Sequence, residues 1–438
     1  MLSLYFKNAA AAIQKAFSIK DELLWFMLGQ VFNLGANFYI IKSISNIGKQ
    51  DFGEYVLILT ISALLGFIIF GPAQQGFVRF FYKSYEENTL PGLISTFKKF
   101  IMTIAAVILI LGITAYMLLF INNAGSIKEL VLYGSVFIVF SKVSEFYNVS
   151  LNIIRQRKLN SILQICEKTI VILCLSIMAY MKLMSLYSVL IALSCIFGIF
   201  AVVKFYQFNK LTKEKFLNTP KGTEASQPYN VKELLIYAAP FLLWGISAWL
   251  QQNGEKWIMV KYLSIIDVGL YGVLITVVNM LVATPNTLLN DFMSPIIFNK
   301  FANLSDKNMI KSGEQFIRIT NLLIAGIVGL SVVLTYFGGD MLIRLFSNKS
   351  YTSLSGLLPL FTVGTGLFYI GQTMCNKGMA FNKPKVYLLP KIILGVISIG
   401  LNFIFILKVG VSGVAYASII SSSVYVAHIY FINRRFKV

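Results

Sequence analysis

The sequence predicts an all-α, polytopic membrane protein, and three observations carry that prediction. Of the 438 residues, 57% are hydrophobic and only 13% are charged, against about 25% charged residues in ordinary soluble proteins. The mean hydropathy is +0.74. The apolar residues gather in runs of about 20, the length that a helix needs to cross the hydrocarbon core of a bilayer. Too few polar side chains remain to cover a soluble globule of this size, so a water-soluble enzyme is excluded.

About twelve such runs are expected to form transmembrane helices. They cover approximately Leu23–Ile44, Tyr55–Phe80, Phe100–Ile121, Leu130–Ile154, Leu159–Met181, Leu186–Phe208, Leu234–Tyr262, Leu270–Phe298, Phe316–Phe337, Leu357–Phe381, Val386–Leu407 and Val411–Ile432. Residues 1–20 place apolar side chains at helical spacing, which predicts a short helix lying on the membrane surface. Because Asp21 and Glu22 precede the first run, we do not expect a cleaved signal peptide.

The basic residues predict the orientation of these helices. When the connections are assigned to alternating sides, 26 of the 38 Lys and Arg residues, Lys204 and Lys391 among them, fall on the side of both termini, and 8 fall on the other. Cytoplasmic connections collect Lys and Arg, so we expect both termini in the cytoplasm. Topology thus accounts for the net charge of +20, and nucleic acid is not an expected partner.

A polar linker is expected to divide the chain into two lobes. The longest polar stretch, residues 209–232, is rich in Lys and also contains Pro and Gly, which predicts a cytoplasmic linker. It separates an N-lobe, residues 1–208, from a C-lobe, residues 233–438, with six spans each. Phe52-Gly53-Glu54-Tyr55 near the second span is echoed by Val268-Gly269-Leu270-Tyr271 near the eighth, 216 residues later. Parallel repeats of this kind are typical of transporters with a cavity between two lobes.

The sequence lacks the residue sets of common catalytic and metal sites. The four cysteines lie inside apolar runs, and His428 is the only histidine. Neither a histidine-based zinc site nor a Ser-His-Asp triad can therefore be assembled. The sequence contains no GxxxxGK[ST] loop, which argues against ATP hydrolysis by this chain. We expect no catalytic residues, no metal and no cofactor, and hence no enzyme.

The paired glycine motifs belong to an ordered set that spans nearly the whole chain. The set comprises Phe52–Tyr55, Tyr237–Pro240, Val268–Tyr271, Lys383–Lys385 and Gly410–Ala417. It resembles the flippases of bacterial inner membranes that export O-antigen and capsule repeat units, within the multidrug/oligosaccharidyl-lipid/polysaccharide exporter superfamily. Where relatives often have Asp followed by a basic residue in the seventh span, this chain has Glu255-Lys256. The charge pattern is kept, and the acidic side chain is longer.

The resemblance implies a MATE-like transporter fold, a V-shaped bundle of two six-helix lobes in the bacterial inner membrane. It also implies a flippase that moves an undecaprenyl-diphosphate-linked oligosaccharide from the cytoplasmic to the outer leaflet by alternating access. The expected partners are this glycan lipid, membrane lipid, and a polymerase and other polysaccharide-assembly proteins, with the flippase itself a monomer. Two alternatives stay open: a multidrug efflux antiporter of the same superfamily and, with less support because the outer connections are short, a polysaccharide polymerase.

Ionisable residues inside the spans are candidate functional groups, since each costs at least ~2.5 kcal/mol to insert. The basic ones are Arg79, Lys142, Lys168 and Lys256, and the acidic ones are Glu145, Glu167, Glu255 and Asp291. The helical rise allows Glu145 of the fourth span to meet Lys168 of the fifth. The charges of these two spans either hold the helices together or include a lysine that binds diphosphate. We expect diphosphate binding among the four basic residues, and a coupling proton or cation at Glu145, Glu255 or Asp291.

Amide side chains indicate which helices face a polar cavity. They are Gln30, Asn33 and Asn37 on the first span, Gln74 and Gln75 on the second, Gln251 and Asn253 on the seventh, and Asn279, Asn286 and Asn290 on the eighth. Lipid would leave amides without hydrogen bonds, so these four helices are expected to line the cavity and bind sugar. The alternative is hydrogen bonding between helices with no ligand. Trp244, Trp249 and Trp257 are either interface anchors or platforms for sugar rings.

Overall fold

The structure is a computed structural model that describes residues 24–25, 27–123, 125–217, 231–301, 307–381 and 383–435. These residues form helices and turns, without a strand. The first helix covers residues 24–25 and 27–45. It is followed by α2 (Lys49–Leu65), the π-helix η1 (Gly66–Phe70), α3 (Gly71–Glu86), α4 (Leu90–Ile121), α5 (Ile127–Ile153), α6 (Arg157–Tyr180), α7 (Leu186–Thr212), the π-helix η2 (Lys213–Leu217) and α8 (Val231–Tyr262). The rest are α9 (Ile265–Val278), the π-helix η3 (Asn279–Ala283), α10 (Thr284–Lys300), α11 (Lys307–Phe346), η4 (Lys349–Leu357), α12 (Leu358–Met374), α13 (Asn376–Ala380), η5 (Pro384–Tyr387), α14 (Leu388–Val409) and α15 (Val411–Asn433).

The predicted fold class is confirmed. Within the described ranges, eleven helical stretches are long and apolar enough to cross a membrane, and they match the second to twelfth expected spans. The first helix is not among the eleven; it carries three amides and is correspondingly less apolar. The expected surface helix over residues 1–20 lies outside the described residues. Of the expected linker, residues 209–217 continue the helix of the sixth span, and residues 218–230 lie outside the described part.

The chain divides into two compact units. Unit 1 comprises Met1–Ser43 and Ile69–Ala239, and unit 2 comprises Ile44–Ile68 and Pro240–Val438. These units differ from the expected lobes chiefly in residues 44–68. That segment belongs to unit 2 because α2 packs along α9.

A π-helix followed by a proline occurs after each of the two helices that carry a glycine motif, α2 and α9. The π-helix η1 is followed by Pro72, and the π-helix η3 by Pro285. Proline has no amide hydrogen and its ring crowds the preceding turn, so a helix commonly bulges beside it. The chain passes from unit 2 to unit 1 at Ile68, inside η1, and returns to unit 2 at Pro240, inside α8.

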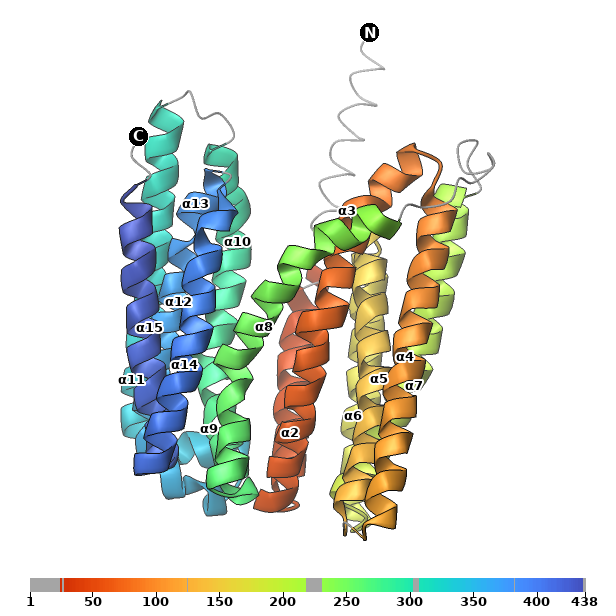
Figure 1. The fold of residues 1–438 in the computed structure, drawn as a ribbon, viewed down its shortest axis with the longest axis vertical. Helices are drawn as coiled ribbons and strands as arrows, with labels where there is room; N and C mark the ends of the chain where they lie inside the picture. The colour runs from red at the N-terminus through yellow and green to blue at the C-terminus, as the bar shows by residue number, and fades with distance from the viewer. Residues whose placement is uncertain are drawn as a thin grey trace. The chain divides into compact units, whose positions relative to one another are not determined.

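Unit 1 has an aromatic core that joins four of its helices. The ring of Phe77 on α3 lies 4.7 Å from that of Phe97 on α4, 5.7 Å from that of Phe146 on α5 and 6.1 Å from that of Phe208 on α7. The helices α4, α5, α6 and α7 run side by side (Figure 1), with the most extensive contact between α5 and α7. The four rings therefore join α3, α4, α5 and α7 in one aromatic core.

In unit 2 the two glycine motifs of the repeat pack against each other. A Cβ atom on Gly53 would overlap the carbonyl oxygen of Ile265, and one on Gly269 would overlap the carbonyl oxygen of Lys49. Only glycine lets the α2 and α9 backbones approach so closely. The buried hydroxyl of Tyr351 lies within hydrogen-bond distance of two backbone carbonyls in the turn before α2. The motifs that predicted the repeat therefore form the α2–α9 interface.

Candidate functional site

Unit 2 contains a polar cavity of about 470 Å³. Its walls come from α2, α8, α9, η3, α12, α14 and α15, and half of its 22 lining residues are Ser, Thr, Asn or Gln. Side chains of these four types can both donate and accept hydrogen bonds. The cavity can therefore hold a ligand that carries many hydroxyl or amide groups.

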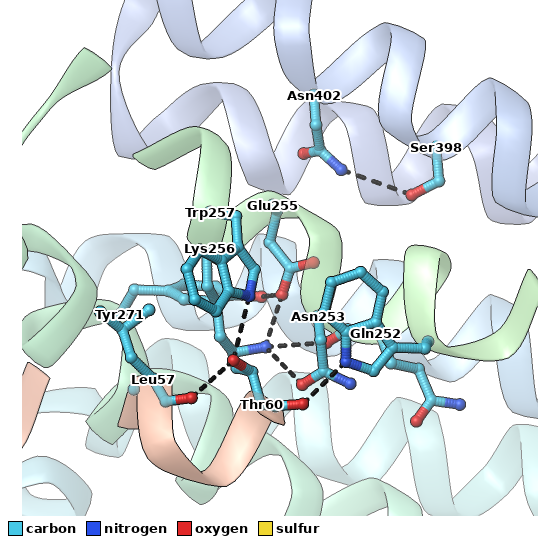
Figure 2. Close-up of polar contacts among 12 residues, drawn as sticks. Leu57, Thr60, Gln252, Asn253, Glu255, Lys256, Trp257, Tyr271, Ser398 and Asn402 are labelled. Atoms are coloured by element: carbon cyan, nitrogen blue, oxygen red, sulfur yellow. Dashed lines mark hydrogen bonds and ion pairs between the residues drawn. The ribbon is translucent and has the colours of Figure 1, made fainter. Parts of the chain in front are cut away.

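Two adjacent residues of α8, Glu255 and Lys256, are the charged members of the cavity wall. Their side chains are 4% and 7% exposed, and Lys256 Nζ lies 2.7 Å from Glu255 Oε1. The Tyr271 hydroxyl donates to the same carboxylate oxygen over 3.1 Å, as Figure 2 shows. Lys256 Nζ also donates to the Gln252 carbonyl oxygen at 2.8 Å and to Asn253 Oδ1 at 3.3 Å. The two charges balance, so the cavity wall carries no net charge.

Two buried acceptor atoms of the cavity residues have no hydrogen-bond partner among the described residues. They are Glu255 Oε2 and Asn402 Oδ1, while Asn402 Nδ2 donates to Ser398 Oγ over 3.4 Å (Figure 2). Leaving a buried acceptor unmatched costs about 1–3 kcal/mol. Glu255 Oε2 is thus suited to receive a ligand hydroxyl, a proton or a monovalent cation, and Asn402 Oδ1 a ligand hydroxyl or a monovalent cation. The described residues contain no group of three His, Cys, Asp or Glu side chains that could hold a metal ion.

Two tryptophans of α8 converge on one residue of α2. Trp249 Nε1 donates to the Thr60 carbonyl oxygen at 2.8 Å, and Trp257 Nε1 donates to Thr60 Oγ1 at 3.0 Å. Thr60 Oγ1 in turn donates to the Leu57 carbonyl oxygen at 2.7 Å. These indole N–H groups tie α8 to α2 and so fix one wall of the cavity.

The amides of the first helix make hydrogen bonds to α6 within unit 1. Asn33 Nδ2 donates to Gln164 Oε1 at 2.7 Å, and Lys168 Nζ donates to Asn37 Oδ1 at 3.1 Å. The two hydrogen bonds are separated by one helical turn, and both join the first helix to α6. For Asn33 and Asn37 the structure shows the interhelical bonding that the sequence left open as the alternative to a water-filled cavity. Gln30, one turn earlier, is partly buried.

The contact between Glu145 and Lys168 that the helical rise allows is not formed between these two described residues. Glu145 Oε2 instead lies 2.8 Å from Lys142 Nζ, three residues earlier on α5. Residues three apart on a helix are neighbours on its surface, so Glu145 forms its ion pair with a lysine of its own helix. With 56% of its side chain exposed, Glu145 remains at the surface of unit 1.

A buried polar triad in unit 1 was not predicted from the sequence. Lys204 Nζ on α7 lies 2.6 Å from Glu167 Oε2 on α6 and 2.7 Å from Ser144 Oγ on α5. Ser144 Oγ lies 3.0 Å from the same carboxylate oxygen. Lys204 is fully buried, which corrects its assignment to the cytoplasmic connections, because α7 continues two turns beyond it to Thr212.

The other predicted residues lie apart from the cavity or outside the described side chains. Arg79 on α3 is exposed. Asn286 is buried and donates to the Val282 carbonyl oxygen at 2.7 Å, and Asn290 Oδ1 accepts from Asn376 Nδ2 at 2.7 Å. The side chain of Asp291 lies outside the described part. The predicted residues that the cavity brings together are Gln251, Asn253, Glu255, Lys256 and Asn279.

Several cavity residues carried little signal in the sequence. Thr60 and Ser398 are small polar residues that membrane helices also use for backbone hydrogen bonds. Asn402 could have been found, because it is an amide inside an apolar run like those already considered. Tyr271 belongs to the second glycine motif, and the pattern of that motif does not indicate that the phenol hydroxyl bonds to Glu255.

Comparisons with known proteins identify the fold. No family model matches the chain, and no curated protein sequence does. Among solved structures, the lipid II flippase MurJ in an inward closed conformation matches with a TM-score of 0.68 and 16% identity, over 94% of this chain and 87% of that one. An inward-facing multidrug resistance MATE transporter of the MOP superfamily matches with a TM-score of 0.64 and 14% identity, over 95% and 97%. A mutant of the Vibrio cholerae MATE transporter VcmN matches with a TM-score of 0.63 and 13% identity, over 95% and 97%.

These likenesses extend over nearly the whole described chain. The chain therefore has the fold that MATE transporters share with MurJ, as the sequence predicted, and is a multi-pass membrane protein.

Proposed function

We propose that the chain is a flippase that moves an undecaprenyl-diphosphate-linked oligosaccharide repeat unit from the cytoplasmic to the outer leaflet of the bacterial inner membrane, for O-antigen or another surface polysaccharide. The observation that carries this proposal is the make-up of the unit 2 cavity. Neutral amides and hydroxyls surround a balanced ion pair, Glu255 and Lys256. Such walls suit a sugar, whose hydroxyls donate and accept hydrogen bonds. A volume of about 470 Å³ lies within the ordinary range of ligand pockets, about 300–1,000 Å³.

The diphosphate needs cations in addition to this cavity. Arg79 is exposed, and its planar guanidinium can contact two phosphate oxygens at once. We assign it the capture of the diphosphate headgroup. The alternative role of Arg79 is to anchor α3 at the membrane surface.

We assign coupling to Glu255. Of the expected coupling carboxylates, Glu145 is exposed and paired with Lys142, and the side chain of Asp291 is not described. Glu255 is buried, lines the cavity and keeps one carboxylate oxygen without a partner in the described part of the chain. Proton or cation binding at this oxygen would favour one arrangement of the transporter over another, and a gradient would then drive transport.

Multidrug efflux is the second candidate function. The Glu255 Oε2 atom, without a partner among the described residues, could accept a cationic drug, and two of the three solved structures named above are MATE transporters. A site for cations is expected to carry net negative charge, whereas Lys256 neutralises Glu255 here.

Reconstitution into liposomes distinguishes the two functions. A fluorescent undecaprenyl-diphosphate disaccharide and the cationic dye ethidium are offered to the same proteoliposomes, with and without an imposed proton or sodium gradient. A flippase translocates the lipid in a gradient-dependent manner and leaves ethidium unmoved. Ethidium transport without lipid translocation would favour efflux. If the lipid is translocated at the same rate after the gradient is collapsed, the proposed coupling role of Glu255 is contradicted.

The proposed orientation places both termini and residues 209–232 in the cytoplasm. We further propose that the chain acts as a monomer beside a polymerase and other polysaccharide-assembly proteins. A reporter active only outside the membrane, fused at Lys215, is expected to be silent, and the same reporter at Lys128 is expected to be active. Activity at Lys215 would contradict the orientation.

A further inference from the structure

Lys391 is a cation without an acidic partner among the described residues. It lies in the first turn of α14 and is partly buried, and its Nζ atom lies 4.3 Å from the centre of the Trp244 ring on α8. By contrast, Lys142, Lys204 and Lys256 each have a carboxylate within 2.8 Å. The aromatic face attracts the ammonium group but supplies no hydrogen-bond acceptor. The three N–H groups of Lys391 therefore remain available to an anion.

The face of α14 that carries Lys391 also carries two residues of the cavity wall. Lys391, Ser398 and Asn402 fall at positions i, i+7 and i+11, which lie on one side of a helix. Ser398 and Asn402 line the cavity. At ~1.5 Å per residue, Ser398 lies about 10 Å along the helix from Lys391, and Asn402 about 16 Å.

The facing side of α8 has the same spacing. Trp244, Gln251 and Glu255 also fall at i, i+7 and i+11, and the last two line the cavity. The helices approach closely between these positions, where a Cβ on Gly395 would lie 2.9 Å from the Ser247 carbonyl oxygen. The Lys391–Trp244 contact therefore lies on the same two helix faces as the cavity residues, about two helical turns away from Ser398 and Gln251.

We infer that Lys391, held over Trp244, is the diphosphate subsite of unit 2, so that the saccharide attached to the diphosphate extends into the cavity. This inference rests on the proposed function, which supplies a substrate with adjoining anionic and sugar portions. An amino group held over an aromatic ring has N–H donors that can bind an anion. The sequence alone places Lys391 with the cytoplasmic lysines and gives no reason to select it.

The test measures the equilibrium dissociation constant of two probes for the purified full-length protein in detergent, with native mass spectrometry as the readout. The probes are farnesyl diphosphate and farnesol, which share the prenyl chain and differ in the diphosphate. The wild type is expected to bind the diphosphate more tightly than the alcohol. Lys391→Gln is expected to weaken diphosphate binding about tenfold, as loss of a hydrogen bond to a charged group predicts, and to leave farnesol binding unchanged. Lys391→Arg is expected to retain most of the affinity.

Lys408→Gln is the matched control. Lys408 is an exposed lysine at the opposite end of the same helix, and its replacement is expected to leave both affinities unchanged. A second readout does not depend on the stability of the Gln variant. Diphosphate binding is expected to move Lys391 Nζ away from the Trp244 ring and so to change the intrinsic tryptophan fluorescence of the wild type. The Trp244→Phe variant is expected to lack that change. Unchanged diphosphate affinity in Lys391→Gln would overturn the subsite while leaving the flippase proposal standing. Equal affinity of the wild type for both probes would overturn both proposals.

Discussion

Replacing Lys204 with Met tests the buried triad of unit 1. The substitution removes the cation that lies 2.6 Å from Glu167 Oε2, and it leaves that carboxylate, 7% exposed, among apolar helices. Breaking a buried pair by removing one partner costs about 3–5 kcal/mol, because an uncompensated charge remains. In a domain of 150–250 residues each kcal/mol lowers the melting temperature by about 2–4 °C. We therefore expect Lys204→Met to lower the melting temperature by about 6–20 °C.

The assay is thermal unfolding of the purified protein in one detergent, monitored by intrinsic fluorescence. The control is Lys142→Met, because Lys142 also pairs with a carboxylate on a membrane helix, but its partner Glu145 is 56% exposed. Exposed pairs contribute about 0–1 kcal/mol, so this variant is expected to melt within about 4 °C of the wild type.

A double variant separates loss of the ion pair from loss of packing. Lys204→Met with Glu167→Gln removes both charges and is expected to recover most of the lost stability, since neutral replacements of a buried pair are often tolerated. Equal melting temperatures for Lys204→Met and Lys142→Met would refute the reasoning, as would a double variant less stable than Lys204→Met alone.

Three further predictions concern other parts of the molecule. Gly53→Ala is expected to destabilise the protein strongly, because its Cβ overlaps the Ile265 carbonyl oxygen, whereas Gly400→Ala, with open space at the Cβ position, is expected to be neutral in the same melting assay. Tyr351→Phe removes the hydroxyl that bonds the turn before α2 and is expected to cost about 1–3 kcal/mol by leaving a buried carbonyl without its donor; no change in melting would contradict that bond. Arg79→Gln is expected to abolish surface glycan at normal protein levels, with partial rescue by Lys, and wild-type glycan in the Gln variant would leave only the anchoring role.

The helices were predictable because a membrane span needs one property, a run of apolar residues about 20 long. The same rule explains where the prediction of individual charges failed. Lys204 lies close to the end of its apolar run, so composition alone assigns it to a connection, and only the continued helix and the carboxylate on α6 reveal that it is buried. Partners on other helices depend on how the helices face one another, which one sequence does not specify.

The candidate site was predictable in part for a related reason. Glu255 and Lys256 stand out because charges inside a span are costly, and both line the cavity. Asn33 satisfied the same criterion of polarity in an apolar run, but it bonds to Gln164. Water, ligand and a neighbouring amide all satisfy an amide equally well, so the sequence pattern cannot distinguish among them.

The central claim is that the unit 2 cavity holds the saccharide of a lipid-linked substrate, and photo-crosslinking tests it most directly. An undecaprenyl-diphosphate disaccharide with a diazirine on its terminal sugar is incorporated into proteoliposomes, irradiated, and mapped by peptide mass spectrometry. The account predicts adducts at cavity residues such as Gln251, Ser398 and Ser418, with competition by unlabelled substrate. Adducts confined to exposed side chains outside the cavity, such as Ile199 and Tyr206 of α7, which are 62% and 63% exposed, would contradict it.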